Sequence, residues 1–279
     1  MRKPAILRYT AFTDVPTGGN PAGVVLDAAT LDDASRQRIA AELGYSETAF
    51  VTPRADGDYD VRYFSPEAEV PFCGHATIAT GVALAERNGP ARRRFHTRAG
   101  EVPVDTQAVA GGLTATLTSV VPHVEPVPRT LLDDALAALH YGAGDLDPAL
   151  PPRIGYAGAR HLILAAATRA RLADLDYDYE ALKQTMLAHD ITTVDLVYRA
   201  DERTFHARNP FPVGGVVEDP ATGAAAAAFG AYLREQGLVT PPATITIHQG
   251  ADMGRPSLLT VTIEAERPEI RVSGRAVAM

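Results

Sequence analysis

Apolar residues recur along this chain with two different periods. The stretches LTATLT (113–118) and TITIHQG (244–250) alternate apolar and polar residues, which predicts half-buried β-strands. The stretches 31–43 and 175–187 instead place apolar residues at helical spacing behind Asp residues suited to capping, which predicts amphipathic helices. The chain is therefore expected to mix helices and strands along its length.

Two further helices are predicted from runs of small residues. The first extends from Cys73 to Gly89, and the second contains Ala224–Ala228 and ends at Gly237. Alanine favours the helix and leaves room for neighbouring elements. Pro220 suits the approach to the second helix because its missing N–H is not needed there. We therefore expect close packing against both helices.

The stretch EDPATG (218–223) before the second helix leaves two interpretations of Asp219. Its carboxylate either caps the helix, which is the simpler interpretation, or belongs to a small-anion site at the helix start. The second interpretation arises because the first N–H groups of a helix have no partner within it. The sequence alone leaves both open.

The second half of the chain repeats landmarks of the first half in the same order, at offsets of 144 to 148 residues. The matched pairs are 31–43 with 175–187, 61–66 with 205–210, 73–89 with 221–237, and 113–117 with 259–263. This period is too long for a solenoid and indicates a duplicated α/β domain, whose ligands favour the cleft between domains. The proline-rich stretch 120–132 is the expected crossover, which gives domains of 1–124 and 125–267.

The internal alignment also shows where the two halves differ. Glu47 aligns with Thr193, and Asp219 aligns with Pro71. If the two small-residue helices face one cleft, Glu47, His75 and Asp219 converge there from three segments. We therefore expect an asymmetric acid–base set within a symmetric frame.

Composition excludes several classes of protein. The formal net charge of -8 and the pI of about 5.5 argue against nucleic-acid binding. A single cysteine rules out an intrachain disulfide and suits a reducing compartment. The N-terminal residues show no apolar segment of a secretory signal, and the uncharged window 223–233 is too short to span a bilayer. We expect a cytoplasmic protein with neither a nucleic-acid nor a membrane partner.

Five motifs point to a known family. They are FTDVPTGGNPAGVVL, YSETAFV, YFSPEAEVPFCGHAT, EDPATGAAA and QGADMGRPS, in this order. From about Thr10 to the C-terminus, the chain resembles the phenazine-biosynthesis isomerase-like (PhzF-type) proteins. The resemblance implies an α/β (α+β) diaminopimelate-epimerase-like fold of two similar domains, each a curved β-sheet or barrel around a central helix. It also implies that the last strand, 268–279, returns to the first domain, and that the protein is a homodimer.

The resemblance further implies an activity and a set of site residues. Members of known activity isomerise a small hydroxylated cyclic amino acid without a cofactor, by moving a proton between carbons. The residue matching Glu47 is the acid–base there, while those matching His75 and Asp219 hold the substrate and assist. The other positions implied to bind substrate are Asn20, Gly74, Thr222, Gly223 and Ala224. We expect a cofactor-independent isomerase or epimerase of a small anionic substrate, since one positioned base can serve afterwards as the acid.

Some residues depart from the family pattern. Members commonly carry Ser at the position of Ala224, so a hydroxyl group is missing here. The epimerases of this fold use two cysteines, which this chain cannot supply, and Cys73 is expected to be a buried small apolar residue. The histidines show no ligand spacing such as HExxH, so no metal site is expected. Two alternatives stay open: a lyase or hydrolase that uses Glu47 in the same cleft, and a small-molecule binding or self-resistance protein without turnover.

Overall fold

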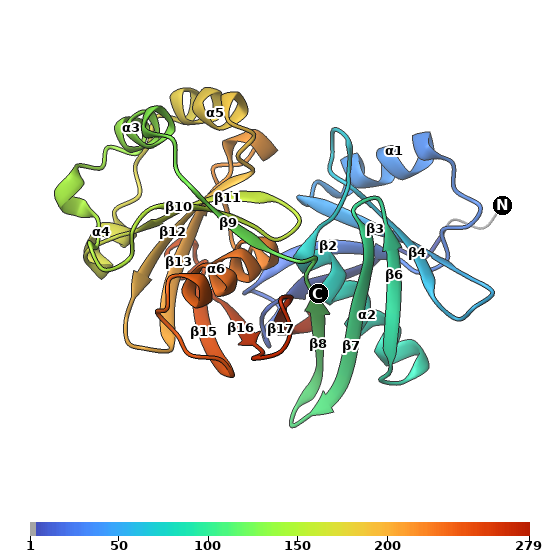
Figure 1. Cartoon of the computed structure of the whole chain (residues 1–279). Coiled ribbons are helices and arrows are strands. Elements are labelled where there is room, and N and C mark those ends of the chain that lie inside the picture. The colour runs from blue at the N-terminus through green and yellow to red at the C-terminus, as the bar shows by residue number, and fades with distance from the viewer. Residues whose placement is uncertain (1–3) are drawn as a thin grey trace. The chain divides into compact units, whose positions relative to one another are not determined.

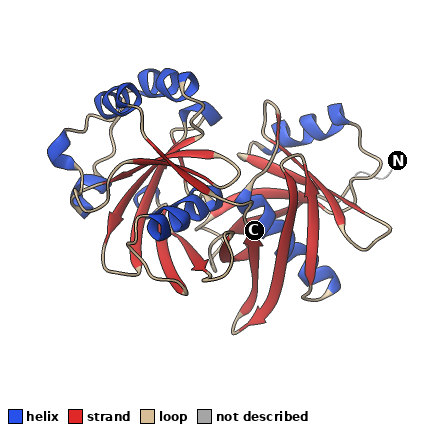
Figure 2. Cartoon of the chain, viewed as in Figure 1, coloured by secondary structure: helices blue, strands red, loops and turns tan. Residues whose placement is uncertain are grey.

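The computed structural model describes residues 4–279, which form two compact units. The first segment of unit 1 ends at Thr118, unit 2 is Ser119–Ile270, and Arg271–Met279 belongs again to unit 1. Both units combine helices with strands (Figure 2). The first boundary lies at residue 118 rather than the expected 124, because the strand His123–Pro126 pairs within unit 2. No helix of the described residues is long and apolar enough to cross a membrane.

The strands of unit 1 close into a barrel (Figure 1). They are β1 (Leu7–Ala11), β2 (Asn20–Val25), β3 (Glu47–Pro53), β4 (Tyr59–Phe64), β5 (Glu69–Val70), β6 (Arg92–Thr97), β7 (Gly100–Val109), β8 (Gly112–Thr118) and β17 (Ile270–Ala278). Pairing runs from β17 through β1, β2, β3, β4, β6 and β7 to β8. The C-terminal strand completes the ring, because Val272 pairs with Leu117 and Val277 pairs with Thr10.

The sheet of unit 2 repeats this pairing pattern. Its strands are β9 (His123–Pro126), β10 (Arg153–Tyr156), β11 (Arg160–Ala165), β12 (Thr193–Arg199), β13 (Thr204–Pro210), β14 (Glu218–Asp219), β15 (Ala243–Gln249) and β16 (Ser257–Ile263). From β10 to β16 the pairs are antiparallel, parallel, antiparallel, parallel and antiparallel, as they are from β1 to β7. The shared order confirms the duplicated α/β architecture.

One of the four landmark pairs joins strands that are not equivalent. The stretch 113–117 lies on β8, whereas 259–263 lies on β16, which holds the place that β7 has in unit 1. Every strand with one buried face alternates apolar and polar residues, so the pattern could not distinguish β7 from β8. The other three pairs match equivalent elements of the two units.

Each sheet wraps around one small-residue helix, as predicted. These helices are α2 (Gly74–Asn88) in unit 1 and α6 (Gly223–Glu235) in unit 2. The strands approach so closely that glycine is needed at one point of each helix. A Cβ atom on Gly81 would lie 2.9 Å from a methyl of Val104, and one on Gly230 would lie 2.8 Å from a methyl of Val261. Small side chains thus allow a sheet to enclose a helix.

The remaining helices cover the outer faces of the sheets. They are α1 (Asp33–Leu43), α3 (Arg129–Ala138), α4 (Arg169–Ala173) and α5 (Tyr179–Ala188). Asp32 caps α1 and Asp178 caps α5 through their carboxylates, which confirms the predicted caps. The helix expected from residue 175 begins only at Tyr179, and the expected crossover 120–132 contains β9 and the start of α3.

Four polar side chains form a buried chain of hydrogen bonds in unit 2. His161 Nδ1 donates to Thr193 Oγ1 at 2.7 Å, and this hydroxyl donates to Asn209 Oδ1 at 2.9 Å. Asn209 Nδ2 in turn donates to Asp195 Oδ1 at 3.0 Å. Asn209 also pairs through its backbone with Asp219 on β14. The chain therefore supports the short strand that carries Asp219.

Burial favours the uncharged forms of His161 and Asp195, the two ends of this chain of hydrogen bonds. It lowers the pKa of His161 to about 3 and raises the pKa of Asp195 to about 7. The Nε2 atom of His161 has no hydrogen-bond partner among the described residues. Because Thr193 aligns with Glu47, this network stands where unit 1 has its candidate acid–base residue.

The glycines of the central helices give a first prediction. We expect Gly81→Ala and Gly230→Ala each to destabilise the protein by about 1–3 kcal/mol, because the added methyl overlaps a β-branched strand residue. The cost of this overlap is expected to exceed the stability gained from the higher helix propensity of alanine. Urea unfolding measures the change, and Glu42→Ala on the exposed face of α1 is the control, expected to shift stability by less than about 0.5 kcal/mol. Stabilisation by either glycine change would contradict the close packing.

The buried carboxyl gives a second prediction. Between about pH 4 and pH 7, folded Asp195 keeps a proton that the unfolded chain loses, so the free energy of unfolding falls as pH rises. Asp195→Asn cannot ionise yet still offers Asn209 an acceptor oxygen, so we expect a shallower fall. Urea unfolding from pH 5 to pH 8 tests this, with exposed Asp174→Asn as the control. Identical slopes in wild type and Asp195→Asn would disprove it.

Candidate active site

Three sequence-predicted residues of unit 1 meet around the ring of His75. Glu47 is the first residue of β3, Asn20 is the first of β2, and His75 lies in the first turn of α2. Asn20 Nδ2 lies 3.0 Å from His75 Nδ1, and Glu47 Oε2 lies 3.3 Å from His75 Nε2. With the Asn20 amide donating to Nδ1, the neutral ring carries its proton on Nε2 and directs it toward Glu47.

The Glu47 carboxylate is far less exposed than a loop glutamate. The side chains of Glu47 and His75 are 12% and 5% exposed. The structure places Glu47 at the start of a strand, beside the buried ring of His75. A carboxylate that is so largely covered interacts more with the neighbouring imidazole than with water.

Two residues of this cluster were not expected from the sequence. Ser46 Oγ lies 3.3 Å from His75 Nε2, and Cys73 Sγ lies 3.3 Å from Nδ1 and 3.7 Å from Nε2. Cys73 is buried, as predicted, and its sulfur contacts the His75 ring. Both residues stand within one or two positions of Glu47 or His75, which was the signal available in the motifs.

The predicted residues of unit 2 form a second polar cluster at the start of α6. Thr222 Oγ1 donates to Asp219 Oδ2 at 2.6 Å. Gln249 Nε2 donates to the backbone oxygen of Asp219 at 2.7 Å, and its Oε1 accepts from the Thr222 N–H at 3.0 Å. Gln249 was not singled out from the sequence, although it lies in the motif QGADMGRPS. It ties the loop before α6 to the end of β15.

The N-cap residue of α6 is Thr222 and not Asp219. The Thr222 hydroxyl donates to the Asp219 carboxylate, which therefore lies beside the start of the helix. The first N–H groups of α6, from Gly223 onward, have no acceptor within the helix. Ala224 is half-buried, unlike the fully buried alanines that follow it. The helix start therefore retains donors for an acceptor from outside the helix.

The neighbouring carboxylate, Glu218, has a structural partner. Its two oxygens accept from the Arg208 guanidinium at 2.9 and 2.5 Å, and both side chains are largely buried. This paired geometry satisfies Glu218 and fixes β14 to β13. Of the two adjacent carboxylates, Asp219 is thus the one that belongs to the polar cluster at α6.

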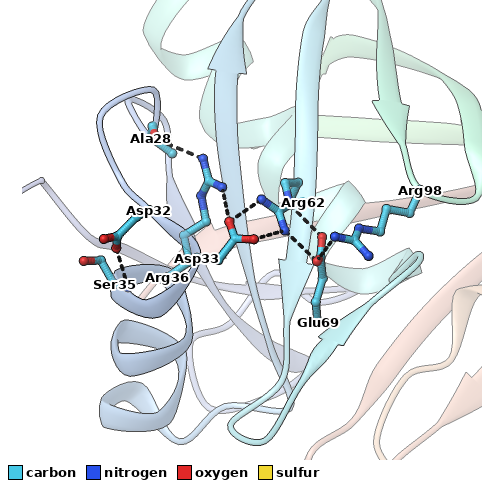
Figure 3. A network of polar contacts seen from close by, with 8 residues as sticks. All are labelled: Ala28, Asp32, Asp33, Ser35, Arg36, Arg62, Glu69 and Arg98. Carbon is cyan, nitrogen blue, oxygen red and sulfur yellow. Dashed lines mark hydrogen bonds and ion pairs between the residues drawn. The ribbon is translucent and has the colours of Figure 1, made fainter.

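Unit 1 contains another polar region, which we do not assign as the active site. A pocket of about 410 Å³ is lined by Arg36, Arg62, Arg98 and other residues. Figure 3 shows Arg62 held between Asp33 and Glu69, with Arg98 and Arg36 reaching the same two carboxylates. Each guanidinium already has a carboxylate partner, so the charge of the region is largely compensated. Its contacts hold α1 against β4.

Proteins with similar sequences are named as isomerases. The trans-2,3-dihydro-3-hydroxyanthranilate isomerase of Pseudomonas fluorescens is 32% identical over 271 residues, which cover 96% of this chain and 94% of that protein. An uncharacterized isomerase of Escherichia coli O157:H7 is 33% identical, over 99% of this chain and 97% of its own length.

Solved structures show the same fold over the whole chain. A PhzF-family phenazine biosynthesis protein of Bacillus anthracis has a TM-score of 0.88 and 28% identity, covering 100% of this chain and 98% of its own. A protein described as a predicted epimerase from Pseudomonas aeruginosa has a TM-score of 0.89 at 27% identity, with coverage of 99% and 97%. A hydroxyproline epimerase of Agrobacterium vitis, at 14% identity and a TM-score of 0.70, shares the fold.

A family model supports the same assignment. The model described as phenazine biosynthesis-like protein matches residues 9–279, nearly the whole chain. Its extent agrees with that of the named isomerases and of the solved PhzF-family structures. The chain belongs to the phenazine biosynthesis-like (PhzC–PhzF) family.

Proposed function

We propose that this protein is an isomerase that moves a proton between two carbons of a small anionic substrate, without a cofactor. Glu47 is the acid–base in this proposal. The observation that carries it is the buried Glu47 carboxylate 3.3 Å from His75 Nε2. The names of the relatives, as isomerases of the same family, support the reaction class.

The contacts of Glu47 suit a proton acceptor that later gives the proton back. The carboxylate takes a proton from one substrate carbon and becomes a neutral acid. His75, whose ring is held by Asn20, keeps the carboxylate in one orientation before and after the transfer. The acid then returns the proton to a second carbon, so substrate and product differ only in the position of one hydrogen.

The polar cluster at α6 supplies groups for the anionic part of the substrate. We propose that Asp219 and Thr222, with the N–H groups of Gly223 and Ala224, act on the same molecule as Glu47. In unit 1, the N–H group of Gly74 at the start of α2 has the same role. Helix N-termini favour negative charge through their free N–H groups and their dipole. The charge that develops on the substrate as the proton leaves is stabilised in this way.

Replacement of the carboxylate tests the acid–base role. In D₂O, we expect wild-type protein to exchange or move a C–H proton of trans-2,3-dihydro-3-hydroxyanthranilate or of another cyclic or β-hydroxylated amino acid. Glu47→Gln keeps the shape of the side chain but cannot accept the proton, so the rate is expected to fall by at least about 100-fold. NMR of each C–H signal measures the rate, and Glu42→Gln on exposed α1 is the matched control, expected to be fully active.

Other outcomes of that experiment identify other functions. Equal exchange in wild type and Glu47→Gln would exclude Glu47 as the base. Incorporation of water or loss of a substrate fragment would indicate a hydrolase or a lyase. Tight binding that survives Glu47→Gln, with no turnover by either protein, would indicate a binding or self-resistance protein.

The half-buried Ala224 gives a test of substrate choice. Family members commonly carry a hydroxyl here, and Ala224→Ser restores a donor at the start of α6. For trans-2,3-dihydro-3-hydroxyanthranilate, we expect Ala224→Ser to raise kcat/KM by about tenfold, the value of one net hydrogen bond. Ala224→Val, which adds similar bulk without a hydroxyl, is expected to give no gain. An equal effect of both changes would show that the hydroxyl is not the determinant.

A further inference from the structure

The His75 ring contacts the side chains of Glu47 and Cys73, and all three residue types commonly bind metal ions. Glu47, Cys73 and His75 each offer one ligand atom, and the three atoms all lie within 4.8 Å of one another. A carboxylate, a thiolate and an imidazole are the three protein ligands that zinc takes most often. The set is buried: Cys73 is 7% exposed, and the other two side chains are also well covered.

The spacing of these atoms suits a tetrahedral ion. Zinc–ligand bonds of about 2.0–2.3 Å at tetrahedral angles separate the ligand atoms by roughly 3.4–3.6 Å. Here His75 Nε2 lies 3.3 Å from Glu47 Oε2 and 3.7 Å from Cys73 Sγ. Two edges of the tetrahedron are therefore close to their required lengths, and the third, between the Glu47 carboxylate and Cys73 Sγ, is within 4.8 Å.

We propose that Glu47, Cys73 and His75 form a binding site for Zn²⁺ or a similar soft divalent cation. Binding turns the Cys73 thiol into a thiolate and releases its proton to solvent. The charges of one carboxylate and one thiolate then balance those of the ion, which suits a buried setting. Three protein ligands leave a fourth position open to water or to a substrate atom.

Asn20 completes the arrangement as a partner of the ring. When Nε2 binds the ion, the neutral imidazole carries its proton on Nδ1 instead. Asn20, whose amide nitrogen lies 3.0 Å from Nδ1, accepts a hydrogen bond from the Nδ1–H group once an amide flip presents its oxygen. A hydrogen-bond acceptor on the second ring nitrogen is the usual support of a zinc-bound histidine.

The consequence for activity rests on the proposed function. A Glu47 carboxylate bound to the ion cannot accept a proton from carbon. Zn²⁺ is thus expected to act as a reversible inhibitor of the isomerase, with activity restored by a chelator. As a chelator removes Zn²⁺ from the site, isomerase activity is expected to rise in parallel.

A second group of ligand-type residues provides an internal control. Asp56, Asp58 and His96 also place ligand atoms within 4.8 Å of one another, but this group is more exposed and has no sulfur. In this group, His96 Nε2 lies 3.4 Å from Asp58 Oδ2, a distance that is ordinary for a surface ion pair. Removing His96 should therefore leave the cation site at Cys73 intact.

Cobalt binding to the substrate-free protein tests the site. Added Co²⁺ is expected to produce a thiolate-to-cobalt charge-transfer band in the near ultraviolet, and Zn²⁺ should displace it. Cys73→Ala should abolish the band and weaken Zn²⁺ binding by at least about tenfold, whereas His96→Asn should change neither. Thermal unfolding of the metal-free Cys73→Ala and Cys73→Ser proteins shows whether each variant is folded. Should Cys73→Ala misfold, Cys73→Ser takes its place, since it too removes the sulfur.

The two proposals fail in different ways. Co²⁺ binding without the band, or with equal affinity in folded Cys73→Ala or Cys73→Ser, overturns the cation site and leaves the proton-transfer assay of Glu47→Gln untouched. A band that depends on Cys73, in a protein that moves no proton on any substrate, supports the cation site and counts against the proposed isomerase. Activity that is insensitive to Zn²⁺ at concentrations that displace Co²⁺ and remove the band overturns the inhibitory role.

Discussion

The packing of a helix inside a sheet is the constraint on which the rest of this structure depends. Where the strands approach the enclosed helix most closely, at Gly81 and Gly230, there is no room even for a methyl group. The same constraint fixes where chemistry can occur. The interior of each unit is filled, so polar side chains collect at the helix start, where β2 and β3 begin in unit 1 and where β14 and β15 end in unit 2.

The two units share the same arrangement of strands and a central helix but carry different polar side chains at equivalent positions. At the start of β3, unit 1 has Glu47 beside an imidazole, whereas unit 2 has Thr193 within a chain of hydrogen bonds. Burial without a charged partner drives His161 and Asp195 toward their neutral forms. The duplicated fold therefore holds one cluster in which a largely buried carboxylate contacts an imidazole and one hydrogen-bond network that supports a strand.

In the two proposals made for the cluster around His75, acid–base chemistry and metal binding compete for the same atoms. A carboxylate poised to take a proton is also a good ligand, and a sulfur in contact with the same ring adds to the attraction for a soft cation. An enzyme of this kind would depend on keeping such ions away. The single cysteine of the chain thereby acquires a chemical role that its burial alone does not indicate.

Local patterns in the sequence determined the elements and the duplication. Helical and alternating periods arise because one face of each element must be buried, so they identified α1, α2, α6, β8 and β15, and the repeated order of elements revealed two similar halves. The same patterns could not say which strands are neighbours, which is why 113–117 and 259–263 were wrongly paired. The motif resemblance pointed to Asn20, Glu47 and His75 but gave no distances. Only the tertiary structure brought Ser46 to the His75 ring and Gln249 to Asp219, because the packing of strands and helices, and not spacing along the chain, sets which distant side chains meet.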